Sequence, residues 1–301
     1  MDRRLIQTLC ALLLCVSSAA AWTDESGHPV TLWLVDGKSN SVYLLGSIHM
    51  LREQDHPLPG VIDSAYDDAE IIVMELDMDD LDPAYTQMAF NRAGVRTDGT
   101  SLRDLMGDDA YAQAAEAAAA LDIPLDMLAQ SEPWLAAMTV EIMLLYRIGF
   151  NPMLGVEMVL TTRAVDDGKP IEGLETIDEQ LALLDGLPLD VQSEMLIQTL
   201  AEGAAMGESI DALIDAWYHG DVAALETGLL DSFAGHSELS EVLITSRNHR
   251  WAETIAGWLG DDEDYLVIVG AMHLVGDEGV PALLAKRGLG IQQLSEPAGL
   301  R

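Results

Sequence analysis

The chain has 301 residues, of which 51 are acidic and 15 are basic, and its formal net charge is −36. This charge argues against nucleic acid as a partner, because phosphate binding needs clustered Lys and Arg side chains. Hydrophobic residues make up 49% of the chain, so we expect a globular protein with a sizeable core rather than a disordered one.

Residues 1–21 indicate a secretory signal peptide. Two arginines precede an apolar run, which ends in small residues that suit a cleavage site. The alternative is an N-terminal membrane anchor, which is disfavoured because the apolar run is shorter than the ~20 residues that span a bilayer. We therefore expect one mature domain over residues 22–301 and a periplasmic or secreted location.

Both cysteines, Cys10 and Cys15, lie in this leader, so the predicted mature chain has no thiol. Disulfides, thiolate metal ligands and a cysteine nucleophile are thereby excluded from it. A metal site would have to be built from His, Asp and Glu side chains. No second apolar run of about 18 residues follows, so we expect no transmembrane helix in the mature chain.

The mature chain is predicted to begin with a β-hairpin. Two strand-like runs, residues 30–35 and 41–48, flank the polar turn DGKSN. A third apolar run, residues 69–77, is short and bracketed by acidic residues, which indicates a buried strand.

The middle of the chain is predicted to be helical. Ala-rich residues 102–121 indicate one helix, with Thr100 or Ser101 as its cap. Residues 131–150 indicate another, with Ser131 as its cap and a proline in its first turn. Because this second helix is apolar nearly all round, we expect it to be buried in the core.

Strands at both ends of the chain surround this helical middle, and no Pro-, Gly- or Ser-rich linker divides it. The order predicts an α/β fold with a central mixed or mostly parallel sheet flanked by helices and a helical middle segment. The remaining predicted elements are a helix closed by Gly168, a strand at 170–176, short helices over 177–230, a long helix at 237–260, a strand that begins at 265, a helix at about 278–287 and a strand at 290–294.

The same motif ends two of the predicted strands. In VYLLGSIHM, residues 42–50, an apolar run leads into Gly-x-x-His at His49, and in YLVIVGAMHL, residues 265–274, another does so at His273. Glu75 lies at the end of the third strand. Because ligand sites of open α/β sheets lie beyond the carboxyl ends of strands, these three side chains form a plausible set for a divalent metal. The alternative is that both histidines serve only the core.

Three further residues are candidates on weaker grounds. Glu157 opens a helix, where an acid also favours the helix dipole, and Glu175 ends a short strand, where it could equally cap the next helix. Arg247 could hold a carboxylate of the site or of a substrate, although such an arginine is more often a surface or ion-pair residue. His249 lies about 200° around the same helix and is left out of the site.

Taken together, these segments resemble the TraB/GumN family, which includes YbaP-like bacterial proteins and is related to the Tiki proteases. The resemblance covers about residues 30–294 and implies an α/β fold like that of erythromycin-esterase-like and ChaN-like proteins. It also implies that His49, His273 and Glu75 are metal-binding or catalytic, whereas Glu157, Glu175 and Arg247 match other recurrent family positions. The motifs that carry it are VYLLGSIHM, IIVMELD, GVE, IEGLET and VIVGAMHLVGDEGVPALLAKRG, in that order.

The resemblance to Tiki proteases further implies a metal-dependent hydrolase whose substrates are peptides or proteins. A bound Mn²⁺, Co²⁺ or Zn²⁺ would lower the pKa of its water and polarise the scissile carbonyl, with Glu75 or Glu157 as general base. Two features depart from that pattern. Ser47 stands where threonine is commoner, and the Tiki membrane tether is lacking. The second departure puts the Tiki substrate in doubt for this chain. The alternative function is a non-catalytic module that binds a peptide or another ligand on the same fold.

Overall fold

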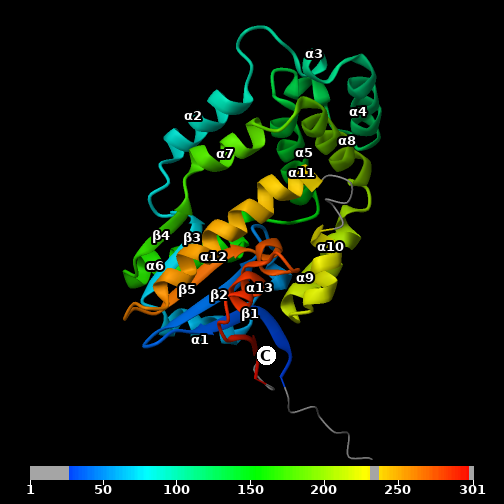
Figure 1. The fold of residues 1–301 in the computed structure, drawn as a ribbon. Coiled ribbons are helices and arrows are strands. Elements are labelled where there is room, and N and C mark those ends of the chain that lie inside the picture. Colours follow the sequence, from blue (N-terminus) through cyan, green and yellow to red (C-terminus); the bar gives the residue numbers. More distant parts are fainter. Residues whose placement is uncertain (1–26, 231–236, 298–301) are drawn as a thin grey trace, which may run out of the picture.

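The computed structural model describes residues 27–230 and 237–297, so the signal peptide predicted at residues 1–21 lies outside the described residues. Within these ranges six strands form one sheet in the order β4-β3-β5-β2-β1-β6 (Figure 1). The strands are β1 Pro29–Asp36, β2 Ser41–Ser47, β3 Ile71–Leu76, β4 Ile171–Glu175, β5 Tyr265–Gly270 and β6 Ile291–Ser295.

The sheet is mixed, which confirms the predicted class. The hairpin of β1 and β2 is antiparallel, and β6 adds to β1 in antiparallel orientation at one edge. The strands β2, β5, β3 and β4 run parallel to one another. The two strands that lead into Gly-x-x-His, β2 and β5, are therefore direct neighbours, with Ser47 opposite Gly270.

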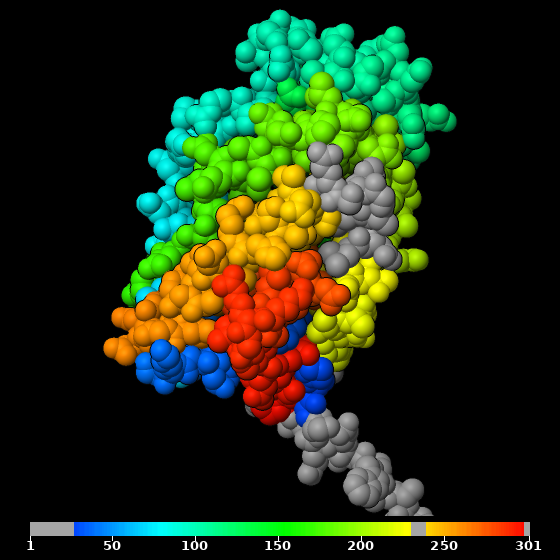
Figure 2. All heavy atoms as spheres, viewed as in Figure 1, coloured from blue at the N-terminus to red at the C-terminus, as the bar shows by residue number. Residues whose placement is uncertain are grey.

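Helices cover both faces of the sheet, as the prediction of flanking helices requires. One face packs against α1 Gly60–Asp68, α6 Val156–Asp167, α9 Met206–Tyr218 and α10 Val222–Leu230. The other face packs against α12 Ser246–Trp258 and α13 Val280–Lys286, which are orange to red in Figure 2.

The central strand β5 shows why this arrangement follows from the sequence. Its side chains alternate between the two faces, with Leu266 and Ile268 in one core and Val267 and Val269 in the other. All six residues of the strand are buried. A strand covered on both faces must be apolar throughout, and YLVIVG meets that requirement.

The middle of the chain adds a helical lobe beyond one end of the sheet (Figure 1). Two small cores hold it together, one shared by α3, α4, α5 and α8, and one formed around Trp134 by α2, α5 and α7. The predicted helical middle is thereby confirmed. Its helices are α2 Pro83–Gly94, α3 Leu102–Met106, α4 Asp108–Ala120, α5 Pro133–Arg147, α7 Ile177–Asp185 and α8 Leu189–Glu202.

Residues 102–121 form two helices rather than the single helix expected. Gly107 has a φ of 80°, which ends α3 and lets α4 begin at the next residue. Of the two caps considered, Ser101 is the one used. Its hydroxyl accepts the Asp104 N–H at 3.2 Å, and the Asp104 carboxylate accepts the Ser101 N–H at 2.9 Å.

The helix α5 differs from the prediction at its start and in its burial. Glu132, not Ser131, is the N-cap residue, because Ser131 pairs with Val95 in an isolated β-bridge. The helix is also not buried all round, since Ile142 and Tyr146 are exposed. The expectation of a core helix was wrong for this side of α5, because part of it borders a pocket instead of another helix.

The long helix predicted at residues 237–260 is interrupted once. A π-helical segment, Glu241–Thr245, joins α11 Ser237–Ser240 to α12. Such segments widen one turn of a helix and are frequent at functional sites. Neither this helix nor any other in the described part of the chain is long and apolar enough to cross a membrane.

Candidate functional site

A pocket of about 580 Å³ lies at the carboxyl ends of β2, β3 and β5. Its polar lining comes from these strand ends, from α12 and from one residue of α5, whereas its apolar lining comes mainly from α5, α9, α10 and the segment after α5. Both Gly-x-x-His histidines and the strand-end glutamate therefore line one pocket. The polar residues are Ser47, His49, Glu75, Glu141, Arg247 and His273, and the apolar ones include Met138, Ile142, Leu145, Phe150, Ile210 and Leu213.

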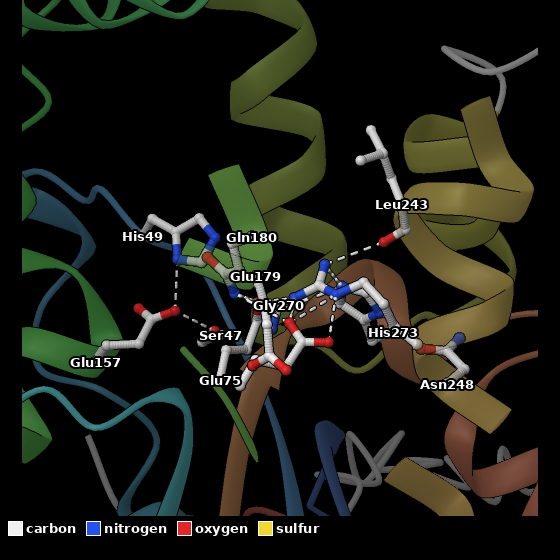
Figure 3. Close-up of polar contacts among 12 residues, drawn as sticks. Ser47, His49, Glu75, Glu157, Glu179, Gln180, Leu243, Asn248, Gly270 and His273 are labelled. Carbon is white, nitrogen blue, oxygen red and sulfur yellow. Dashed lines mark hydrogen bonds and ion pairs between the residues drawn. The ribbon is translucent and has the colours of Figure 1, made fainter. Parts of the chain in front are cut away.

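His49 follows β2 and is held by Glu157 (Figure 3). The imidazole Nδ1 donates to Glu157 Oε1 at 2.6 Å, and the Ser47 hydroxyl donates to the same oxygen at 2.5 Å. The His49 side chain is 71% exposed, and the Glu157 carboxylate beside it raises the pKa of the ring to about 9. His49 is therefore an imidazolium at neutral pH, and its second nitrogen, Nε2, also carries a proton.

The start of α6 places Glu157 beside this ring. Gly155 is the N-cap of α6, and the Val156 N–H donates to the Ile48 carbonyl at 3.1 Å. A Cβ on Gly155 would lie only 2.1 Å from the His49 carbonyl oxygen, so the close approach requires glycine. Burial raises the pKa of Glu157, but His49 outweighs burial and lowers it. Its Oε2 has no hydrogen-bond partner among the described residues.

Glu75, on β3, is held by three donors. Its Oε1 accepts the Gly270 N–H at 2.8 Å, and its Oε2 accepts from Arg247 Nη2 at 2.6 Å and from Gln180 Nε2 at 3.1 Å. Burial alone would raise the pKa of Glu75, but the surrounding His and Arg side chains outweigh burial and lower the pKa to about 2. Glu75 is therefore a carboxylate at neutral pH.

Arg247 bridges two of the glutamates. Its Nε donates to both oxygens of Glu175, at 3.1 and 2.9 Å, while its Nη2 bonds Glu75. Its Nη1 donates to the Leu243 carbonyl of the π-helical segment at 3.0 Å. The guanidinium also lies over Trp251, 4.6 Å from the ring centroid. Arg247 and Glu175 are both buried, so this bridge is a fixed part of the site rather than a surface ion pair.

His273 follows β5 and is buried in a defined tautomer. Asn248 donates through Nδ2 to the Glu278 carbonyl at 2.8 Å, so its Oδ1 must accept from His273 Nδ1, at 2.6 Å. The other ring nitrogen, Nε2, is then unprotonated and accepts from Arg247 Nη1 at 3.2 Å. Burial lowers the pKa of His273 to about 4, so this ring is neutral where His49 is charged.

Three of these side chains meet at Gly270 (Figure 3). A Cβ at this position would lie 3.3 Å from Glu75 Oε1, 3.6 Å from His273 Cδ2 and 3.9 Å from His49 Nε2. Both histidines therefore have a ring atom within 4 Å of the same point. Because glycine has no Cβ, no side chain of residue 270 stands between these three groups.

The donor types at Gly270 suit a divalent metal, but their arrangement does not. In the described ranges, 27–230 and 237–297, no group of three His, Cys, Asp or Glu side chains is placed to hold an ion. Arg247 also occupies two of the donor atoms, since its guanidinium bonds His273 Nε2 and Glu75 Oε2. An ion on these atoms would also meet the fixed positive charge of that guanidinium.

The six residues singled out in the sequence are thus all found at or behind this pocket. His49, Glu75, Arg247 and His273 line it, whereas Glu157 and Glu175 lie behind His49 and Arg247. His249, which was left out of the site, lies outside it. Its ring is exposed and pairs with Glu278 at 2.8 Å.

Three participants were not among the predicted site residues, and one of them is Gln180, which donates to Glu75 at 3.1 Å. Asn248 fixes the His273 tautomer, and its only signal was its place next to Arg247 on the same helix. Glu141 lines the pocket from α5. Glu141 is the single acidic residue of α5. This residue was a signal in the sequence, but it was not used because the helix was expected to be buried on all sides.

Comparison with known proteins gives a consistent family assignment. The model of the TraB/PrgY/gumN family matches residues 31–293. An uncharacterised protein of Shigella flexneri, YbaP, is 23% identical over 267 residues, which cover 87% of this chain and 96% of the relative. YbaP of Escherichia coli K12 is 23% identical over 242 residues, or 80% of this chain and 87% of the relative. No solved structure matches the chain significantly.

Proposed function

The chain belongs to the TraB/PrgY/gumN family, and from this premise we propose that it is a hydrolase whose active site is the pocket around His49, Glu75 and His273. The observation that supports the proposal is the placement of these side chains around Gly270, in a pocket whose remaining lining is apolar apart from Ser47, Glu141 and Arg247. Once a substrate displaces water, apolar walls strengthen the interaction of such groups with a developing charge. The proposed substrates contain an acyl bond, with the peptide bond as the first candidate.

We assign the role of general base to Glu75 and that of general acid to His49. As the oxygen of a water molecule attacks the carbonyl carbon, Glu75 Oε1 accepts one proton of that water. As the bond to the leaving group breaks, His49 Nε2 gives its proton to the leaving group. Transfer of the proton from Glu75 to His49 then restores both side chains, and the products are a carboxylic acid and an alcohol or amine.

The opposite pKa shifts of the two groups support these roles. With a pKa of about 2 for Glu75 and about 9 for His49, the base is deprotonated and the acid is protonated throughout the neutral range. A carboxylate with so low a pKa is a weak base in the free protein. A bound substrate would remove water from Glu75, and this desolvation would raise its pKa and its basicity.

The other residues act through these two. Glu157 orients His49 and keeps it charged, and Arg247 fixes one oxygen of Glu75 so that the other is directed to Gly270. Glu175 in turn holds Arg247. We therefore regard Glu157, Arg247 and Glu175 as positioning residues.

A divalent ion, Mn²⁺, Co²⁺ or Zn²⁺, stays a separate proposal. It would supply Lewis-acid activation of water, but its binding to both histidines requires Arg247 to leave His273. The mechanism above uses none. Activity that survives a chelator would support the metal-free assignment, and activity restored only by an added ion would favour the metal.

The test is hydrolysis of a fluorogenic peptide library and of simple acyl esters, with a chelator and with each ion in turn. Wild type should turn over at least one class. His49→Ala and Glu75→Gln should each lower the rate at least about 100-fold, since acid–base groups contribute on that scale. His249→Ala is the matched control on the exposed side of α12 and should leave the rate unchanged.

Thermal unfolding of every variant separates lost chemistry from lost folding. No turnover of any substrate by well-folded wild type, with or without metal, would contradict the hydrolase proposal. Ligand capture at the same pocket without turnover would then favour a non-catalytic binding module.

A further inference from the structure

One acidic side chain on the pocket lining has no role in the proposed chemistry. Glu141 lies on α5 together with Met138, Ile142 and Leu145, and these residues are spaced so that they share one face of the helix. Its three neighbours on that face are apolar. Glu141 therefore places a carboxyl group among the hydrophobic side chains of the pocket.

Glu141 differs from the other charged residues of the pocket in having no partner. His49 is paired with Glu157, and Glu75 is paired with Arg247. Glu141 makes no hydrogen bond or ion pair with any described residue. The charges next to Gly270 are thus compensated within the protein, and the charge on the apolar lining is not.

The Glu141 side chain is exposed in the pocket, and a ligand that fills the pocket would take its carboxylate out of water, which is unfavourable for an uncompensated charge. Desolvation by the surrounding protein already raises the pKa of Glu141, and the positive charge of His49 opposes this effect. A ligand cation placed beside the carboxylate would compensate its charge, whereas an anion would be repelled. The chain as a whole, with a formal charge of −36, attracts cations in the same way.

On the basis of the proposed hydrolase function, we propose that the substrate is an apolar acyl compound with a protonated amine, which Glu141 binds. The apolar body would contact Met138, Ile142 and Leu145, and the acyl bond would lie at Gly270 between Glu75 and His49. The amine belongs either to an alkylamine-like small molecule or to the free amino terminus of an apolar peptide. The recognised chemistry, an ammonium group on an apolar body, is the same in both.

Binding to the full chain at neutral pH tests this inference without any need for turnover. Octylamine, octanol and octanoate carry a cationic, a neutral and an anionic head on the same apolar chain. Wild type should bind octylamine at least about tenfold more tightly than octanol, and octanoate most weakly. Glu141→Gln should lower octylamine affinity about tenfold and leave octanol affinity unchanged.

The matched control is Glu116→Gln, which removes the same charge from the exposed face of α4, away from the pocket lining. It should change none of the three affinities. Equal loss in both variants would overturn the inference, because the preference would then arise from the acidic surface as a whole. Absence of any preference for octylamine would overturn it as well.

A second pair of probes distinguishes the two sources of the amine. Trileucine amide with a free amino terminus carries that charge, and its acetylated form has a neutral acetyl amide in its place. A preference for the free form, lost in Glu141→Gln, supports a peptide terminus, and a preference confined to octylamine supports a small amine. An amine preference without hydrolysis would contradict the proposed function alone, whereas hydrolysis without an amine preference would contradict this inference alone.

Discussion

His49 and His273 occupy the same place in two copies of one motif, yet their neighbours give them opposite protonation states. His49 is exposed and contacts a carboxylate, which raises its pKa to about 9, whereas burial lowers the pKa of His273 to about 4 and the Arg247 guanidinium acts in the same direction. The difference arises from the burial of one ring and from α6 and α12, which supply the charged neighbours. A shared motif therefore supplies one charged and one neutral imidazole, and only the charged one can act as a proton donor at neutral pH.

The assignment of His49 as the acid predicts the pH profile. The protonated form exists below its pKa, so the hydrolytic rate should hold through the neutral range and fall as pH rises through about 9. Glu157→Gln removes the main cause of the raised pKa, so the falling limb should move toward the ordinary histidine value of about 6.5. Steady-state rates between pH 5 and pH 10 would be measured for both proteins.

Whether the rate falls or rises as pH passes through about 9 distinguishes two roles for His49. If it acts as a base instead, the rate would rise through pH 9 and the same variant would move that rise to lower pH. From such a profile we would infer that His49 is the base and Glu75 the acid, and the proposed location of the active site in this pocket would not change.

At the level of elements, the contact between α6 and the end of β2 positions the charged half of the site. Gly155 lets the first turn of α6 approach the His49 backbone, and Glu157 in that turn then reaches both Ser47 and His49. On the opposite side, the π-helical segment directs the Leu243 carbonyl to Arg247. Both the glycine contact and the π-helical segment are backbone features, and they hold side chains within hydrogen-bond distance of residues that line the pocket.

Gly155→Ala should therefore separate α6 from His49. The added Cβ would lie 2.1 Å from a backbone oxygen. A backbone atom cannot move aside as easily as the end of a flexible side chain can. We expect a loss of about 1–3 kcal/mol in unfolding free energy and a lower His49 pKa, measurable by denaturant unfolding and by NMR titration. Gly257→Ala on α12 has no atom within 4 Å of the new Cβ and should be neutral or slightly stabilising. Equal stability of the two variants would show that the α6 contact is not tight.

The sequence was sufficient for elements with a strong local pattern. The strand YLVIVG was predictable because a strand buried on both faces is apolar throughout. The Gly-x-x-His ends of β2 and β5 were predictable because ligand sites lie beyond the carboxyl ends of strands. Glu141 and Asn248 were not, because their roles depend on which helix face meets the sheet. The break at Gly107 had a local signal, a glycine followed by two aspartates, which the Ala-rich composition of the run outweighed in the prediction. The exposed side of α5 had none, since an apolar run looks alike whether it borders a pocket or another helix.

For the whole molecule, the charge of −36 predicts a dependence on salt. Some acidic residues are paired, such as Asp63 and Asp67 with Arg163, but the excess of acids leaves most without a basic partner. Repulsion among them destabilises the compact state. The midpoint of thermal unfolding should therefore rise with NaCl, mostly below about 0.2 M, where the Debye length shortens to ~7 Å.

Differential scanning calorimetry over a NaCl series checks this prediction. A salting-out effect would instead continue to rise at molar salt, so the concentration range separates the two causes. A midpoint that falls with NaCl would mean that ion pairs such as those of Arg163 contribute more than the repulsion does.

The place of β5 in the sheet has a consequence for the newly made chain. A ribosome releases β1 to β4 long before β5, and β5 is the strand that joins the β2 edge to the β3 edge. Until it inserts, His49 and Glu75 belong to two separate strand pairs with no shared neighbour. Pairing over such a sequence separation is slow, so the pocket forms as a late folding event. A chain still in synthesis therefore carries both histidine-bearing strands only near its end, and the pocket is not assembled before then.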